Sequence, residues 1–292
     1  MIRMSHRGVC VSDFAIAERF YKEALGYEDA EDYGILEGPD MEKTMELPGV
    51  RLRAKMLQHP SGPRLELLHF LHPTASGSRE RRSTLQYGLV HLSFYVDDID
   101  AHAQKIRDAG GHVVEETRAH NAETGVTLLY CTDPDGTRIE LMHQPGVAGR
   151  FSHSGICVPD IDASLAYYAA LGFRPAENYV FDEAVDFLDT INEVPGIRLR
   201  AQMIRDAEGN TLELLKVFEP ECFGTRERQP LNRIGLTHIA FWDDEIEATI
   251  PILSGLGGYF VEEAHVRMSY IELQHGADPD GVRIELMRPV ND

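Results

Sequence analysis

The chain repeats itself at nearly constant spacing, and this repeat restricts the possible folds more than any other feature. The segment HRGVCVSD from His6 matches HSGICVPD from His153, which lies 147 residues later. The segment DPDGTRIELM from Asp133 matches DPDGVRIELM from Asp278, which lies 145 residues later. Matches at such constant spacing indicate a tandem duplication with its seam in the segment 143–151.

Each half divides again into two similar modules. A module begins with a β-like run that carries a histidine, continues through an amphipathic helix, and ends in strands that close on an L-E-L or I-E-L triplet. In the first module the pattern predicts a helix that is capped by Asp13 and ends at Gly26. In the fourth module Pro251 lies inside the helical pattern and is expected to kink or break the helix. The pattern therefore predicts an α+β fold of four β-α-β-β-β modules.

The length of the chain agrees with two domains. A chain of 292 residues is long for one compact domain, and two domains of about 140 residues are expected. The predicted N-terminal domain covers residues 1–146, with modules at 1–72 and 86–146. The predicted C-terminal domain covers residues 150–292, with modules at 150–219 and 233–292. The segments 73–87 and 219–233 are expected to be loops between modules.

Charge and cysteine usage limit the partners and the compartment. Lys and Arg number 28 against 48 Asp and Glu, so the formal net charge is −20. Unspecific binding to nucleic acid or to an anionic membrane needs the opposite sign, so neither partner is expected. The N-terminal segment lacks the apolar core of a signal peptide, and no run approaches the roughly 20 apolar residues of a membrane span. The four cysteines lack the spacing of a metal knuckle, which favours a reduced, cytoplasmic setting.

Histidine and glutamate recur on one face of the predicted strands. Side chains alternate along a strand, so His6 shares its face with Gly8, whereas Glu66 points away from Leu65 and Leu67. The leucines can pack under the helix, which leaves histidine and glutamate on the opposite, concave face. The same positions recur in all four modules as His6, Glu66, His91, Glu140, His153, Glu213, His238 and Glu285.

This recurrence favours metal binding over a structural role. A single histidine in a strand is usually a hydrogen-bonded core residue, and a single glutamate between leucines usually faces solvent. Four copies of both at equivalent positions need another explanation, because burying unpaired carboxylates is costly. Neutral imidazole and carboxylate together are a ligand set for divalent metal ions. We therefore expect two sites, each with two histidines and two glutamates.

These motifs resemble the vicinal oxygen chelate superfamily, which includes glyoxalase I, methylmalonyl-CoA epimerase, extradiol dioxygenases and bleomycin resistance proteins. The segments GLVHLSF and GLTHIAF, the DPDG-x-x-IEL ends and the FYKEALGY helix carry the resemblance, which covers nearly the whole chain. It implies modules paired into two glyoxalase-like domains, each an open, U-shaped mixed sheet around a metal ion with helices outside. By position it assigns one site to His6, Glu66, His91 and Glu140. It assigns the second site to His153, Glu213, His238 and Glu285.

Four protein ligands favour a lyase or isomerase of the glyoxalase I or epimerase type. A Ni, Co, Zn or Mn ion would stabilise the enediolate of a small oxo or thioester substrate while a glutamate moves the adjacent proton. By position Glu140 and Glu285 are the expected bases. Glu46 and Glu193 occupy the place of a further catalytic glutamate of the epimerase, with a solvated turn carboxylate as an equally weighted alternative.

Two other functions are compatible with the resemblance. An extradiol ring-cleaving dioxygenase would hold Fe(II) with His153, His238 and Glu285 and act on a catechol. The tyrosine of that family is replaced by His275 in the fourth module, whereas Tyr130 in the second module is a near match. A small-molecule binding or resistance protein is the third interpretation, but such members typically lack the ligands.

Three features remain open. The R-E-R segments of the two loops could hold an anion or could be ordinary charged linkers. A homodimer is compatible with the sequence. The sites could form within each half or across such a dimer.

Overall fold

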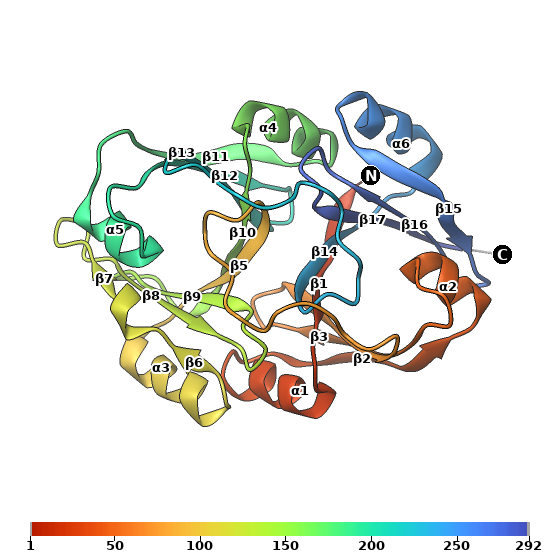
Figure 1. Ribbon diagram of the computed structural model, residues 1–292, viewed down its shortest axis with the longest axis horizontal. Coiled ribbons are helices and arrows are strands. Elements are labelled where there is room, and N and C mark those ends of the chain that lie inside the picture. The colour runs from red at the N-terminus through yellow and green to blue at the C-terminus, as the bar shows by residue number, and fades with distance from the viewer. Residues whose placement is uncertain (1, 291–292) are drawn as a thin grey trace.

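Two curved mixed sheets form the body of the molecule, for which the computed structural model describes residues 2–290 (Figure 1). The first sheet has the order β15 (Tyr259–Arg267), β16 (Ile271–Ala277), β17 (Arg283–Pro289), β14 (Gly235–Trp242), β1 (Arg3–Cys10), β4 (Arg64–His72), β3 (Arg51–Gln58) and β2 (Glu28–Glu37). The second sheet has the order β11 (Arg174–Phe181), β12 (Arg198–Arg205), β13 (Thr211–Glu219), β10 (Arg150–Cys157), β5 (Gly88–Tyr95), β9 (Arg138–His143), β8 (Thr127–Thr132) and β6 (His112–Val113). The short β7 (Ala119–His120) also pairs with β8.

Each sheet combines one module from either half of the chain. Strand β1 of the first module pairs antiparallel with β14 of the fourth, and β5 of the second module pairs antiparallel with β10 of the third. In Figure 1 these pairs lie at the centre of the molecule, with the two sheets opening in opposite directions. We call the first sheet, built from modules 1 and 4, the 1–4 sheet, and the second sheet, built from modules 2 and 3, the 2–3 sheet. The fold class and the four modules are confirmed, but a half does not build a sheet of its own.

The two hydrophobic cores beneath the outer helices, in contrast, follow the halves of the sequence. Helices α1 (Phe14–Glu23) and α3 (Ile99–Asp108) pack on one side of the molecule, where Phe20 and Ile106 belong to a core built almost entirely from the N-terminal half. Helices α4 (Ile161–Ala170) and α6 (Ile246–Gly255) lie on the opposite side over a core built mainly from the C-terminal half (Figure 1). The sheets therefore bind the two halves together. The boundaries at residues 146 and 150 stay a prediction about sequence units.

The helix signals of the sequence were accurate at the start of α1, whereas the break that was one expected effect of Pro251 does not occur in α6. The Asp13 carboxylate accepts a hydrogen bond of 2.9 Å from the Ile16 amide, and Gly26 follows the helix with φ 74°. Helix α6 continues through Pro251 from Ile246 to Gly255. Its buried residues Ile246 and Leu253 lie on both sides of the proline, so core packing holds the helix despite the missing backbone donor.

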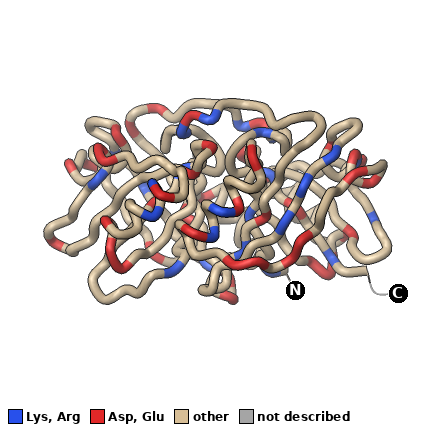
Figure 2. Tube along the Cα trace, turned by 90° about the horizontal axis from the view of Figure 1, so that it is seen from below, with Lys and Arg blue, Asp and Glu red and all other residues tan. Residues whose placement is uncertain are grey.

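Two short helices were not expected from the sequence. Helix α2 (Pro39–Met45) precedes β3, and α5 (Asp186–Asn192) precedes β12. In Figure 1 they lie on opposite flanks of the molecule, on the sides to which the sheets open. At the equivalent place the second module carries a 3-10 turn, η1 (Glu115–Thr117), before β7. No helix within residues 2–290 is long and apolar enough to cross a membrane. Charged residues of both signs are interspersed along the chain (Figure 2).

Candidate metal centres

The concave face of the 1–4 sheet brings four of the expected ligands together. His6 lies on β1, Glu66 on β4, His238 on β14 and Glu285 on β17. The His6 and His238 Nε2 atoms are 3.2 Å apart. The Oε2 atoms of Glu66 and Glu285 lie between 3.5 and 3.7 Å from these nitrogens. We call this cluster the 1–4 site.

The 2–3 sheet carries an equivalent cluster, the 2–3 site. His91 lies on β5, Glu140 on β9, His153 on β10 and Glu213 on β13. The two histidine Nε2 atoms are 3.1 Å apart, and the glutamate Oε2 atoms lie between 3.4 and 4.0 Å from them. All eight predicted ligands thus fall into two clusters of two histidines and two glutamates.

The predicted grouping of the ligands was wrong. The resemblance placed His6 and Glu66 with His91 and Glu140, and His153 and Glu213 with His238 and Glu285. The structure places His6 and Glu66 with His238 and Glu285, and His91 and Glu140 with His153 and Glu213. The reason is strand pairing, because the edge of β1 is taken by β14 and not by β5. Both clusters are complete within one chain.

The spacing of the ligand atoms fits a small divalent ion. Ligands about 2.1 Å from such an ion are roughly 3.0 Å apart in an octahedron and roughly 3.4 Å apart in a tetrahedron. The observed separations of 3.1 to 4.0 Å lie in and slightly above this range. In each site the ligand atoms of both histidines and of Glu285 or Glu140 all lie within 4.8 Å of one another, as they would around one cation, and Glu66 or Glu213 lies beside the same histidines.

Electrostatics also favour a cation at each site. Burial raises the pKa of Glu285 to about 7, with His6 opposing and Glu66 reinforcing the shift. Burial likewise raises the pKa of Glu140 to about 6, with His153 opposing and Glu213 reinforcing it. Two carboxylates buried side by side repel each other, and a divalent ion removes this repulsion.

Small residues make room for the histidine rings. Gly8 lies opposite His238 in the β1–β14 pair, and a Cβ atom there would be 2.1 Å from His238 Cε1. Gly155 lies opposite His91, and its Cβ would be 2.2 Å from His91 Cε1. Glycine is therefore required two residues after His6 and two residues after His153. The H-x-G spacing of the sequence carried this signal, but we did not assign it a role.

Hydroxyl groups orient three of the four histidines. Ser5, Ser152 and Thr237 precede a histidine in the chain, and their side-chain oxygens lie 2.9 to 3.1 Å from its Nδ1 atom. A hydroxyl that accepts from Nδ1–H leaves the Nε2 lone pair free for a metal ion. Val90 precedes His91, whose buried Nδ1 has no hydrogen-bond partner in the described part of the chain. Sequence analysis missed these hydroxyl groups.

The residue that pairs with the glutamate of the last strand differs between the two sites. Tyr130 pairs with Glu140 in the 2–3 sheet, and the Arg138 guanidinium lies 4.3 Å from the centre of its ring. His275 takes the equivalent place opposite Glu285, with its Nε2 3.5 Å from Glu285 Oε1. The His275 ring is 1 % exposed, and neither of its nitrogens has a hydrogen-bond partner within residues 2–290.

Glu46 and Glu193 close the C-terminal ends of α2 and α5 and are held in ion pairs. Both have φ 58°, the left-handed conformation that is uncommon for glutamate. Glu46 accepts hydrogen bonds from Arg228 and from Arg283, the latter at 2.7 Å. Glu193 accepts from Arg81 at 2.8 Å. Each pair joins a residue of one half to a residue of the other half. A catalytic role for either glutamate stays a prediction.

The fold and the two sites define a class of protein in which paired modules form curved sheets around residues that could bind a metal ion. A family model, the Glyoxalase/Bleomycin resistance protein/Dioxygenase superfamily, matches residues 3–141 and 150–286. The chain belongs to this superfamily.

Solved structures agree with this fold. Glyoxalase I from Zea mays superposes with a TM-score of 0.64 at 18 % identity, over 99 % of this chain and 92 % of that chain. A putative dioxygenase from Bacillus subtilis subsp. subtilis str. 168 superposes with a TM-score of 0.59 at 14 % identity, over 99 % of this chain and 85 % of that chain. No curated protein matches the sequence.

Proposed function

We propose that the protein is a divalent-metal-dependent lyase or isomerase of the glyoxalase I or epimerase type. Its substrate class is a small oxo compound or thioester with an acidic proton next to the carbonyl. The observation that carries this proposal is the retention of four ligands, two histidines and two glutamates, in both sites. A dioxygenase of this superfamily would use two histidines and one carboxylate, with positions open for oxygen and substrate.

The chain's own residues supply the proton transfer. The two histidines and two glutamates would hold a divalent ion, which would supply stabilisation of negative charge on the carbonyl oxygen when the neighbouring C–H bond breaks. Glu285 or Glu140 takes the proton on Oε2, the oxygen that faces the two histidines. The second glutamate, Glu66 or Glu213, remains in place beside the same nitrogens. Burial excludes water, which strengthens each of these interactions.

An exchange experiment tests the proposal. The protein is loaded with Co, Ni, Zn, Mn or Fe(II) and incubated in D₂O with a panel of hemithioacetals and 2-branched acyl thioesters. We expect deuterium incorporation next to the carbonyl, detected by NMR, only with bound metal. Oxygen uptake with catechols is measured on the same samples, and uptake without proton exchange would contradict the proposal.

An Fe(II) extradiol dioxygenase remains the second candidate because of Tyr130. Its ring lies 5.9 Å from the His91 ring, in the place where that family carries a tyrosine. The fourth ligand, Glu213, speaks against it. A small-molecule binding protein is the third candidate, and it would show neither exchange nor oxygen uptake. For all three candidates we propose a cytoplasmic protein that acts on a small molecule and can form a homodimer.

A further inference from the structure

The two loops between modules meet at the centre of the molecule and enclose a hollow. The Ser76 amide donates to the Asn232 carbonyl at 2.7 Å, and the Phe223 amide donates to the Leu85 carbonyl at 3.0 Å. Between the loops and the beginnings of β5 and β14 lies an open hollow of about 570 Å³. Its lining includes Arg82, Arg233, Arg283, Thr225, Thr237 and Glu227. We call it the central hollow.

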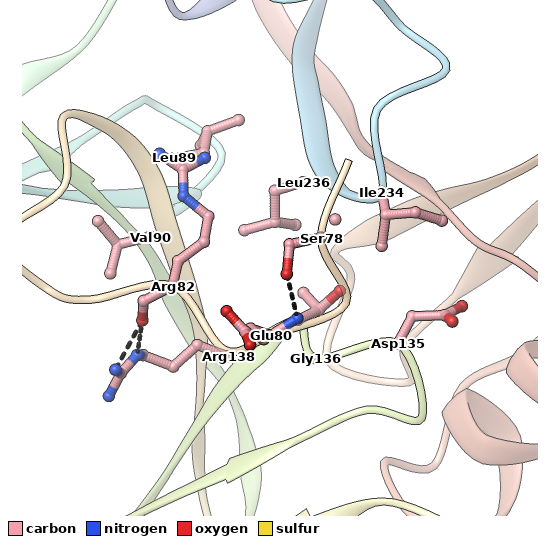
Figure 3. A pocket seen from close by; sticks show the side chains of 12 residues that line it. Ser78, Glu80, Arg82, Leu89, Val90, Asp135, Gly136, Arg138, Ile234 and Leu236 are labelled. Atoms are coloured by element: carbon pink, nitrogen blue, oxygen red, sulfur yellow. Dashed lines mark hydrogen bonds between the residues drawn. The ribbon is translucent and has the colours of Figure 1, made fainter. Parts of the chain in front are cut away.

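A smaller, equivalent hollow lies on the other side of Arg82. Figure 3 shows this second hollow, lined by Ser78, Glu80, Arg138 and Leu236, with Arg82 at its edge. The Arg82 carbonyl there accepts two hydrogen bonds from the Arg138 side chain, at 3.0 and 2.7 Å. The backbone of Arg82 is thus fixed, and its side chain borders both hollows.

Two arginines of the central hollow lack an acidic partner. Arg82 donates to the Tyr87 carbonyl at 2.7 Å and to the Gln86 side chain at 3.3 Å. Arg233 donates to the Gln229 side chain at 2.9 Å. Within residues 2–290 no carboxylate lies within ion-pair distance of either guanidinium. In a chain with 48 acidic and 28 basic residues, such a pair is unexpected.

The neighbouring arginines of the same loops are all paired. Arg79 and Arg81 of the first R-E-R segment bind Asp135 and Glu193. Arg226 and Arg228 of the second segment bind Asp280 and Glu46. The R-E-R arginines, which the sequence suggested as a possible anion-binding site, are therefore paired with protein carboxylates.

The two unpaired arginines also depart from the repeat. The 147-residue spacing aligns Arg82 with Gln229 and Gln86 with Arg233. Each loop therefore carries one arginine and one glutamine four residues apart, but in opposite order. Burial, reinforced by the charge of Arg233, lowers the pKa of Arg82 to about 10. Two like charges are thus held close to each other without compensation, which an anion would supply.

We propose that the central hollow binds a tetrahedral oxyanion of the phosphate or sulfate type between Arg82 and Arg233. Guanidinium groups match two oxygens of such an anion with charge-assisted hydrogen bonds. Thr225 and Thr237 line the same space. The Thr237 Oγ1 atom lies 2.9 Å from His238 Nδ1, so one lining residue of the hollow also contacts a candidate ligand of the 1–4 site.

Titration calorimetry with sodium sulfate and sodium phosphate, against sodium chloride at equal ionic strength, tests the proposal on the full chain. We expect saturable binding of both oxyanions and no binding of chloride. Arg233→Gln is expected to weaken binding about tenfold or more, because a charged hydrogen-bond donor is lost. Glu227→Gln is expected to strengthen it, because a carboxylate at the hollow is removed. A phosphomonoester in the same titration distinguishes free phosphate from an esterified ligand.

Two control variants test whether oxyanion binding depends on the central hollow and not on another arginine or on the 1–4 site. Arg107→Gln removes an exposed arginine of α3 that pairs with Glu115 and does not line the central hollow, and it should leave binding unchanged. His6→Ala disrupts the 1–4 site without touching the hollow, and oxyanion binding should persist in it even if the proposed catalytic function fails. Binding in wild type that Arg233→Gln and Arg82→Gln both leave intact would overturn the proposal, as would the absence of oxyanion binding. Circular dichroism confirms that each variant is folded.

Discussion

The 1–4 site and the 2–3 site contain the same ligands but hold them differently. In the 2–3 site the Ser93 hydroxyl donates to Glu140 Oε2 at 2.7 Å, whereas Ala240 takes the equivalent register position beside Glu285. Glu285 therefore lacks this donor. The histidines show the opposite trend, because His238 is oriented by a hydroxyl and His91 is not.

This difference affects two properties of a site: how tightly it binds a metal ion, and how easily its glutamate can leave the ion to take a proton. Oriented histidines favour tight metal binding, and a glutamate without a hydroxyl partner can leave the metal ion and take a proton. The 1–4 site has both properties. The 2–3 site holds its glutamate firmly and leaves one histidine without support. We therefore expect turnover in the 1–4 site and a mainly structural role for a metal ion in the 2–3 site.

The largest expected effect is the loss of the base. Glu285→Gln should lower the rate of proton exchange by about 10²- to 10⁴-fold, because the amide cannot accept the proton. Glu140→Gln should lower it less than about tenfold if the 2–3 site is structural. Exchange rates are measured with the metal content of each sample determined in parallel. Equal losses in both variants would show that the two sites share the chemistry.

The second-largest expected effect comes from filling the space beside the His238 and His91 rings. Gly8→Ala should displace the His238 ring and lower Co²⁺ affinity of the 1–4 site by more than about 100-fold, since moving a ligand costs more than losing its support. Gly155→Ala should do the same to the 2–3 site through His91. A Co²⁺ titration followed by visible absorption should then count one site instead of two.

Gly255→Ala is the matched control for these glycine variants. Gly255 ends α6, and a Cβ atom there would meet nothing within 4 Å. This variant should keep both sites. Two intact sites in Gly8→Ala would mean that the β1–β14 pair can widen without cost.

The local features of the fold were predictable, because strand alternation and helix caps depend on neighbouring residues. Leu65 and Leu67 lie in the core as their alternation with Glu66 predicted, and the Asp13 cap formed as expected. The recurrence of one histidine and one glutamate per module identified all eight residues that cluster. These conclusions used only short spacings along the chain.

The pairing of modules was not predictable from the same signals. The strands GLVHLSF and GLTHIAF have nearly the same pattern, so β1 could pair with either by its own sequence. The choice depends on how the two halves pack, which no local pattern encodes. The ion pairs of Glu46 and Glu193 were missed for the same reason, because their arginine partners lie in the other half.

Changing the hydroxyl groups that hydrogen-bond to the histidine Nδ1 atoms should affect metal binding less than displacing the rings does. Thr237→Val removes the hydroxyl beside His238 Nδ1 and should weaken Co²⁺ binding at the 1–4 site about 10- to 100-fold. Val90→Thr offers the missing hydroxyl to His91 and should strengthen binding at the 2–3 site. Opposite changes in the two dissociation constants are the expected result. Unchanged constants would show that backbone packing alone orients the rings.

The smallest effect concerns the hydroxyl that holds the glutamate. Ala240→Ser places a hydroxyl beside Glu285 as Ser93 is placed beside Glu140, and the 2–3 site shows that a serine fits there. One hydrogen bond is worth about 0.5 to 1.5 kcal/mol, so exchange should slow about threefold to tenfold while Co²⁺ affinity is kept. Ser93→Ala should leave exchange in the 1–4 site unchanged. A faster rate in Ser93→Ala would mean instead that Glu140, once released, also takes the proton, and that the single hydroxyl of Ser93 keeps the second site inactive.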